Sequence, residues 1–224
     1  MLAALENSDR EPPQRILATA DRAADLTWRF PGLVIETVDS QRLANLRPGA
    51  VHQGVALRPG ELPSVDLESF VPVKGAVLLM LDQVTDPQNV GALLRSAAAF
   101  GCAGVILQDR NAPQLTGALA KAAVGAVDKI PVARVVNLSR ALDQLADMGW
   151  RAVGLDGDAE QTLDRAMDGS PTVLVMGSEG AGLRRLVAEH CDVLAKIPMP
   201  GGFESLNVSA AGAIALYEAS RPRL

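Results

Sequence analysis

Five polar side chains that could bind a ligand or take part in catalysis lie in three separate stretches of this 224-residue sequence. Asn89 and Arg95 belong to the first stretch, Glu179 to the second, and Ser205 and Asn207 to the third. Groups of these types can align two reactants and stabilise developing charge. Because no histidine occurs in the three stretches, a reaction here would depend on alignment and charge stabilisation rather than on an imidazole base.

The first stretch, residues 81–97, reads LDQVTDPQNVGALLRSA and predicts the start of a helix. Asp86 can cap this helix, and Pro87 suits its first position, where a missing backbone N–H costs nothing. Asn89 then falls in the first turn and Arg95 about two turns later, roughly 120° around the axis. One face of the helix therefore does not present both residues, and a single target reaches both only if it wraps around the end of the helix. The local alternative is a capped helix with a solvated arginine.

The second stretch, residues 173–183, combines an apolar strand with a glycine-rich turn and reads VLVMGSEGAGL. The strand is expected to end at Gly177. The turn lacks both Gly-Lys-Ser/Thr and G-x-G-x-x-G, which argues against a nucleoside triphosphate or a dinucleotide. Glycines allow close backbone approach to a ligand, and Glu179 offers a carboxylate to a cationic one. By itself, Glu179 is more often a solvated residue or one at a helix start.

The third stretch, residues 197–219, changes from a loop to a helix rich in small residues. Prolines and glycines between 198 and 202 exclude a helix there. We expect Ser205 to cap a helix over 205–219, beside free backbone N–H groups that could hold a polar ligand. The alternative is a capped helix that packs through its alanines.

Together, the three stretches resemble, in order and spacing, the motifs of the SpoU group of RNA ribose 2′-O-methyltransferases. The resemblance covers residues 74–221 or so. It implies S-adenosylmethionine as the cofactor, a trefoil-knotted α/β domain, a homodimer and a structured RNA substrate. Two fragments, VHQGV at 51–55 and PMPGG at 198–202, are most similar to bacterial enzymes that methylate a guanosine ribose in 23S ribosomal RNA. Transfer RNA is the second candidate substrate.

The resemblance also implies catalytic roles for the five polar residues. It identifies Arg95 as the catalytic arginine and places Asn89, Glu179, Ser205 and Asn207 around it. A guanidinium keeps its proton in proteins. We therefore expect Arg95 to bind a flanking phosphate and to stabilise the developing alkoxide, which leaves the final proton acceptor open.

Further residues are assigned to the cofactor by the same resemblance. Backbone groups of Gly177, Ile197 and Leu206 would hold the adenosyl group, because backbone donors and acceptors suit the edge of adenine. The complete set that the resemblance assigns to S-adenosylmethionine is Met176, Gly177, Gly180, Ile197, Met199, Leu206 and Asn207.

Composition favours a packed globular protein, with 48% apolar and 21% charged residues. No apolar run is long enough for a membrane span and the start does not read as a signal peptide, so a cytoplasmic location is expected. Cys102 and Cys191 are expected to be small buried residues, and the two histidines, His52 and His190, give poor support for a metal site. The net charge of −5 argues against a nucleic-acid partner unless some of the 17 arginines gather on one face.

The elements that must position the three stretches fall into two parts. Residues 1–58 alternate short strands and helices and resemble the ribosomal-protein-L30e-like RNA-binding domain of many SpoU enzymes, with its first elements missing. Within this part we expect strands at 16–19, 33–38 and 54–57 and helices at 21–29 and 39–46. Residues 59–73, with three prolines, read as a linker.

Residues 74–224 predict a parallel sheet covered by helices. Its expected strands are 76–81, 104–107, 130–135, 152–155, 173–176 and 193–197. Its expected helices are 87–100, 115–124, 138–148, 160–167, 182–189 and 205–219. We therefore interpret the chain as a knotted RNA 2′-O-methyltransferase. The alternatives are an inactive RNA-binding protein of the same fold, which the five intact polar residues disfavour, and a nucleotide-dependent α/β enzyme, which the missing phosphate motifs disfavour.

Overall fold

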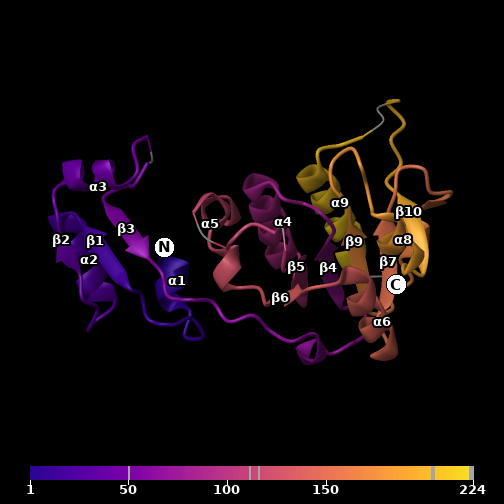
Figure 1. Ribbon diagram of the computed structural model, residues 1–224, viewed down its shortest axis with the longest axis horizontal. Helices are drawn as coiled ribbons and strands as arrows, with labels where there is room; N and C mark the ends of the chain where they lie inside the picture. The colour runs from indigo at the N-terminus through magenta and orange to yellow at the C-terminus, as the bar shows by residue number, and fades with distance from the viewer. Residues whose placement is uncertain (50, 111, 116, 203–204, 222–224) are drawn as a thin grey trace. The chain divides into compact units, whose positions relative to one another are not determined.

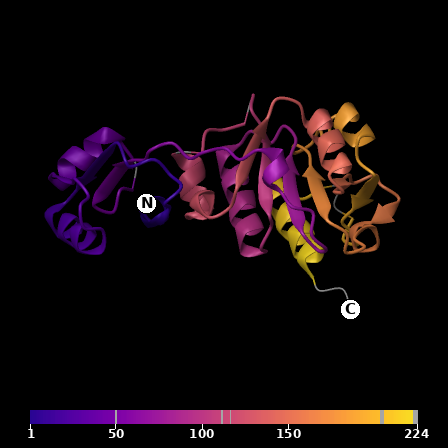
Figure 2. The same cartoon turned by 90° about the horizontal axis from the view of Figure 1, so that it is seen from below.

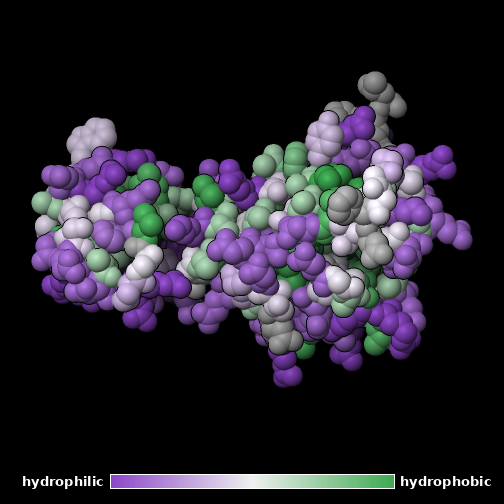
Figure 3. All heavy atoms as spheres, turned by 90° about the horizontal axis from the view of Figure 1, so that it is seen from above, coloured by the Kyte–Doolittle hydropathy of each residue, from purple (hydrophilic) through white to green (hydrophobic). Residues whose placement is uncertain are grey.

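The computed structural model describes residues 1–49, 51–110, 112–115, 117–202 and 205–221. Its contacts divide the chain into two units, Met1–Pro63 and Ser64–Leu224, which we call the N-terminal and C-terminal units (Figure 1). The faces of both units seen in Figure 3 are mainly hydrophilic, with hydrophobic side chains exposed at several places. No helix among the described residues is long and apolar enough to cross a bilayer.

The N-terminal unit is a small three-stranded sheet with helices. Its sheet order is β2-β1-β3, in which β1 runs parallel to β2 and antiparallel to β3. Alternating residues of β1 face two small cores, with Ile16 packed near Leu26 and Leu17 packed near Leu43. The elements are α1 (Leu2–Glu6), β1 (Arg15–Ala18), α2 (Ala20–Arg29), β2 (Glu36–Thr37), α3 (Ser40–Leu46) and β3 (Val55–Arg58).

One strand of this unit is shorter than predicted. The expected strand over 33–38 is reduced to β2, which pairs only through Glu36 and Thr37. Val34 is 90% exposed, so nothing packs on its side chain. A β-branched residue favours a strand mainly through packing against neighbours, and that packing is missing at this position. The short helix α1 was not predicted from the sequence.

The C-terminal unit is built on a seven-stranded sheet of order β6-β5-β4-β9-β7-β10-β8, in which every neighbouring pair runs parallel. The central strands β4 and β9 are buried along their whole length, as the continuous apolar runs predicted. The predicted α/β class with a parallel sheet is thus confirmed. The strands are β4 (Val77–Leu81), β5 (Gly104–Gln108), β6 (Val132–Val135), β7 (Arg151–Leu155), β8 (Gln161–Thr162), β9 (Thr172–Met176) and β10 (Val193–Lys196).

Helices cover both faces of this sheet (Figure 2). Val173 and Val175 of β9 belong to the core under α6 and α8, whereas Met176 lies against α9 on the other face with α4. Residues 64–70 also pack on this unit, since Ser64 Oγ donates to Val132 O and Phe70 is buried in the core. The helices are η1 (Leu67–Ser69), α4 (Pro87–Ala99), α5 (Ala118–Ala123), η2 (Ala126–Asp128), α6 (Leu138–Asp147), α7 (Leu163–Ala166), α8 (Arg185–Glu189) and α9 (Val208–Ser220).

Four predicted helices begin later than expected, and one of them, predicted over 205–219, is α9, which begins at Val208. The helix predicted over 182–189 is α8, which begins at Arg185 because residue 182 pairs with Ser178 in a tight loop. The segment 160–167 divides into β8, which pairs with β10, and the short α7. The helix predicted over 115–124 is α5, which begins at Ala118; residue 116 lies outside the described residues.

The two cysteines, which were expected to be small buried residues, are half-buried. Burial is nevertheless the main reason why the pKa of each thiol, Cys102 and Cys191, is raised to about 12. Thiols with such pKa values stay protonated at neutral pH and are poor nucleophiles.

Close packing at Gly212 fixes α9 against the helix and strand that carry the other two stretches. A Cβ atom at Gly212 would overlap Leu93 Cδ2 of α4 and lie 3.0 Å from Met176 Sδ of β9. All three predicted stretches therefore meet at one helix–helix–strand contact, and only a residue without a side chain fits there.

We predict that Gly212→Ala lowers the free energy of unfolding by about 1–3 kcal/mol, because α9 must move away from α4 and β9. Gly157→Ala is the matched control, since nothing lies within 4 Å of the added Cβ and it should change little. Urea denaturation followed by circular dichroism measures both. Equal midpoints for the two variants would contradict the close packing.

Candidate active site

The three predicted stretches meet at one edge of the C-terminal sheet. The first follows β4, the second follows β9 and the third follows β10. These strands are parallel in the order β4-β9-β7-β10, so their carboxyl ends point to the same edge. Ligands of open parallel sheets bind at such an edge.

A hydrogen bond joins the first and third stretches. Asn207 Nδ2 donates to Asn89 Oδ1 at 3.1 Å across 118 positions of sequence. Asn89 is held in turn because its backbone N–H donates to Asp86 Oδ2, the N-cap of α4, at 3.0 Å. The Asp86-Pro87 helix start is thus confirmed. Two of the predicted catalytic residues, Asn89 and Asn207, lie side by side.

The cap of α9 is Asn207, which corrects the expectation that Ser205 caps this helix. Asn207 Oδ1 accepts from the backbone N–H of Ser209 at 3.0 Å and of Ala210 at 3.4 Å. Ser205 lies before the first turn, is exposed, and makes no hydrogen bond with the described residues. A cap must directly precede the first helical residue, which here is Val208.

The second stretch forms a closed loop at the end of β9. Ser178 and Gly182 exchange backbone hydrogen bonds of 3.1 and 3.0 Å. A Cβ atom at Gly177 would overlap the backbone of Gly182, and positive φ angles occur at Gly180 (83°) and Gly182 (65°). The glycines are therefore needed for the loop itself. They also leave its outer backbone uncovered, because nothing lies within 4 Å of an added Cβ at Gly180 or Gly182.

A buried ion pair that the sequence analysis missed holds this loop. The carboxylate of Asp82, fully buried at the end of β4, accepts from Arg184 N at 2.8 Å and from Arg184 Nε at 2.7 Å. Arg184 Nη2 also donates to Gln108 Oε1 at 3.2 Å. A buried carboxylate is stable only when paired. The sequence did contain a signal for this ion pair, because Asp82 is an acidic residue directly after the apolar run 77–81.

The loop after β7 is a second feature that the sequence analysis missed. Asp156 N donates to Ala195 O of β10 at 3.0 Å, and Asp156 Oδ1 accepts from Asp158 N at 2.9 Å. Because β7 lies between β9 and β10, this loop stands between the second and third stretches. The signal was the Asp-Gly-Asp turn at 156–158, which follows an apolar strand.

The charged residues of the predicted site are not joined to this network. Arg95 and Glu179 are exposed, and neither makes a hydrogen bond or ion pair with the described residues. Leu206 is 38% exposed, while Ile197 and Met199 are half-buried. No cluster of three or more potential metal ligands occurs in the part of the chain that the structure describes.

Comparison with known proteins identifies the family. The SpoU rRNA methylase family matches residues 76–217. A 23S rRNA (guanosine-2′-O-)-methyltransferase, RlmB, of Xylella fastidiosa is 44% identical over 87% of this chain and 80% of its own length. The chain belongs to the SpoU family of RNA methyltransferases. An "uncharacterized tRNA/rRNA methyltransferase" of Mycobacterium avium is 41% identical over 95% of this chain and 69% of its own length.

Solved SpoU structures share the fold of this family member. The methyltransferase AviRb of Streptomyces viridochromogenes matches with a TM-score of 0.83 and 26% identity, over 98% of this chain and 84% of AviRb. An rRNA methyltransferase of Sinorhizobium meliloti with bound AdoMet matches with a TM-score of 0.81 and 28% identity, over 97% and 82% of the two chains.

Two variants of this SpoU protein distinguish the capping of α9 by Asn207 from the hydrogen bond between Asn207 and Asn89. Asn207→Ala removes both and should lower the free energy of unfolding by about 1 kcal/mol. Asn89→Ala removes only the bond between the asparagines, because its backbone still donates to Asp86, and should cost about half as much. Thermal or urea unfolding measures both. A larger loss for Asn89→Ala than for Asn207→Ala would contradict the capping role.

Proposed function

We propose that this SpoU methyltransferase transfers a methyl group from S-adenosylmethionine to the ribose 2′-hydroxyl of a guanosine in 23S ribosomal RNA. The observation that carries the proposal is the Asn89–Asn207 hydrogen bond, which brings two of the five predicted catalytic residues together at the carboxyl edge of the sheet. The specific substrate is supported by 44% identity to an RlmB that covers 87% of the chain.

The carboxyl-edge loops fit the cofactor. S-adenosylmethionine supplies the methyl group when it is bound. The backbone at Gly180 and Gly182 is not covered by other atoms, so a ligand can approach it closely. The exposed Glu179 offers a carboxylate to the sulfonium charge. We assign the adenosyl group to backbone atoms of Gly177, Ile197 and Leu206. The side chains or backbone of Met176, Gly180, Met199 and Asn207 complete this proposed binding set.

The chain's own residues must align the ribose and stabilise its oxygen. In this proposal Asn89, Ser205 and Asn207 orient the ribose, and Arg95 binds the neighbouring phosphate. Arg95 is free for this role because it has no hydrogen-bond or ion-pair partner among the described residues. Its guanidinium stays protonated, so it acts by lowering the cost of the developing alkoxide rather than as a base.

The N-terminal unit is proposed to hold the RNA, as an L30e-like domain over residues 1–58. Its Trp28 is 82% exposed, and an exposed indole suits stacking on an unpaired base. Trp150 of the C-terminal unit is only 3% exposed. RNA binding to the N-terminal unit should therefore quench mainly the fluorescence of Trp28. Unchanged Trp28 emission at saturating RNA would contradict this role.

The chain path supports the proposed trefoil knot. β10 lies beyond β7 in the sheet, yet α9, which follows β10, returns to pack on α4 and β9. The segment that joins β10 to α9 must therefore pass back across the edge near the loop after β7. An electron-density map that traced this segment outside that loop would contradict the knot.

A homodimer is proposed through α9 and its surroundings. Ile214 (45% exposed) and Tyr217 (56% exposed) lie three residues apart on α9, hence on one face. Association would remove these apolar groups from water. A monomeric mass by light scattering at micromolar concentration would contradict the dimer.

We predict that the protein transfers labelled methyl from S-adenosylmethionine to unmodified 23S ribosomal RNA, with the label on a guanosine ribose. Arg95→Lys should lower turnover by about 10–100-fold, because an ammonium cannot reproduce the planar fork. The affinity for S-adenosylmethionine should stay unchanged in this variant.

Bulk transfer RNA is the matched comparison substrate, since the Mycobacterium avium relative carries a tRNA/rRNA name. Label on transfer RNA alone would keep the chemistry and reject the ribosomal substrate. Label on neither RNA would favour an RNA-binding protein without activity. Near-normal turnover of Arg95→Lys would reject the role given to the guanidinium.

A further inference from the structure

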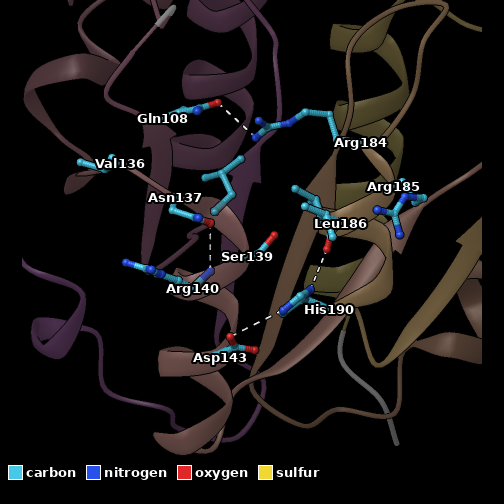
Figure 4. Close-up of a pocket in the computed structure, with 12 residues that line it drawn as sticks. Gln108, Val136, Asn137, Ser139, Arg140, Asp143, Arg184, Arg185, Leu186 and His190 are labelled. Carbon is cyan, nitrogen blue, oxygen red and sulfur yellow. Dashed lines mark hydrogen bonds and ion pairs between the residues drawn. The ribbon is translucent and has the colours of Figure 1, made fainter.

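A groove of about 630 Å³ lies at the carboxyl edge of the same sheet, next to the loop after β9 that we assign to the cofactor. It opens between α6 and α8 at the ends of β5 and β6, whereas β7 and β10 lie on the other side of β4 and β9. Figure 4 shows the side chains that line it. Its volume is in the range of about 300–1,000 Å³ that is typical of ligand sites.

The groove combines apolar side chains with guanidinium groups. Val136 is 72% exposed and Leu186 is 55% exposed, so both present uncovered apolar surface. Arg140, Arg184 and Arg185 stand at different rims of the groove (Figure 4). A nucleotide needs this mixture, because its base has apolar faces and its phosphate is an anion that arginine binds well.

Two arginines around the groove are available to bind an anion. Arg140 makes no side-chain hydrogen bond or ion pair with the described residues. Arg185 pairs with Glu189 at 2.6 Å, but both side chains are more than half exposed, so this pair is weak and can exchange for a phosphate. The acid that lines the groove, Asp143, lies 3.6 Å from His190 Nε2.

Arg184 connects the groove to the loop after β9. Its backbone N–H and Nε bind the buried Asp82, while Nη2 reaches Gln108 on the groove side. The side chain keeps 42% exposure, so part of the guanidinium still faces solvent. A group bound at this rim would contact Arg184, which directly follows the loop that we propose holds the cofactor.

We propose that the groove between α6 and α8 binds a nucleotide of the substrate RNA other than the one that is methylated. The base packs on Val136 and Leu186, and the flanking phosphates are bound by Arg140 and Arg185. The groove thereby fixes the RNA strand relative to the loop after β9. This inference rests on the proposed function, because it concerns how the same RNA is held.

Two groove variants with different signatures test this proposal by filter binding of transcribed 23S ribosomal RNA. Arg140→Glu should weaken binding by about tenfold and lower the slope of log affinity against log salt by about 1, because one phosphate contact is lost. Leu186→Ser should also weaken binding but leave the slope unchanged, since it removes only apolar contact.

Lys74→Glu is the matched control. Lys74 is exposed just before β4, at the amino end of the sheet, so its charge reversal should leave RNA affinity near that of the wild type. Arg140 and Leu186 are exposed, so unfolding midpoints should stay unchanged, and calorimetry should show unchanged affinity for S-adenosylmethionine.

The outcomes separate this inference from the proposed function. Methylation by the wild type with equal RNA affinity for Arg140→Glu, Leu186→Ser and Lys74→Glu would overturn the groove and keep the function. A wild type that neither binds nor methylates RNA would overturn both. Binding of guanosine 5′-monophosphate below about 1 mM, lost in Arg140→Glu without any change in RNA affinity, would assign the groove to a free nucleotide instead.

Discussion

The buried carboxylate of Asp82 is the interaction on which the arrangement of the candidate site depends. It lies at the end of β4 and receives two hydrogen bonds from Arg184, which follows the closed loop after β9. Removing the Arg184 side chain would leave the buried carboxylate of Asp82 without its charged partner, so the ion pair holds the loop where β4 ends. The parallel register of β4 and β9 brings the two segments together, and the ion pair fixes their position.

Packing and hydrogen bonding at α9 place the third segment beside the first two. Gly212 allows α9 to lie directly on Leu93 and Met176, and Asn207 then reaches Asn89 at the start of α4. One asparagine thus caps a helix and joins two segments that are 118 positions apart. Arg95 and Glu179 are exposed and have no hydrogen-bond or ion-pair partner among the described residues, so neither would have to break an internal bond to meet a ligand.

The sequence predicted those features that depend on local rules. Asp86-Pro87 starts α4 as expected, and the buried runs of β4 and β9 form the centre of a parallel sheet. Features that depend on distant partners were missed. Asp82 pairs with Arg184 102 positions away, and Asn207 pairs with Asn89 118 positions away. The cap of α9 is a local feature, but it was placed at Ser205 instead of Asn207, the residue directly before the first helical turn. The roles of Arg95 and Glu179 in catalysis stay predictions.

S-adenosylmethionine is proposed to bind at the loops after β7, β9 and β10 rather than in the groove between α6 and α8. The most direct test is a titration of the labelled protein with S-adenosylmethionine, followed through backbone amide NMR shifts. The account predicts the largest changes in residues 156–158, 177–182 and 205–207, with little change at 137–140 and 185–190. The largest changes at 137–140 and 185–190 would contradict it.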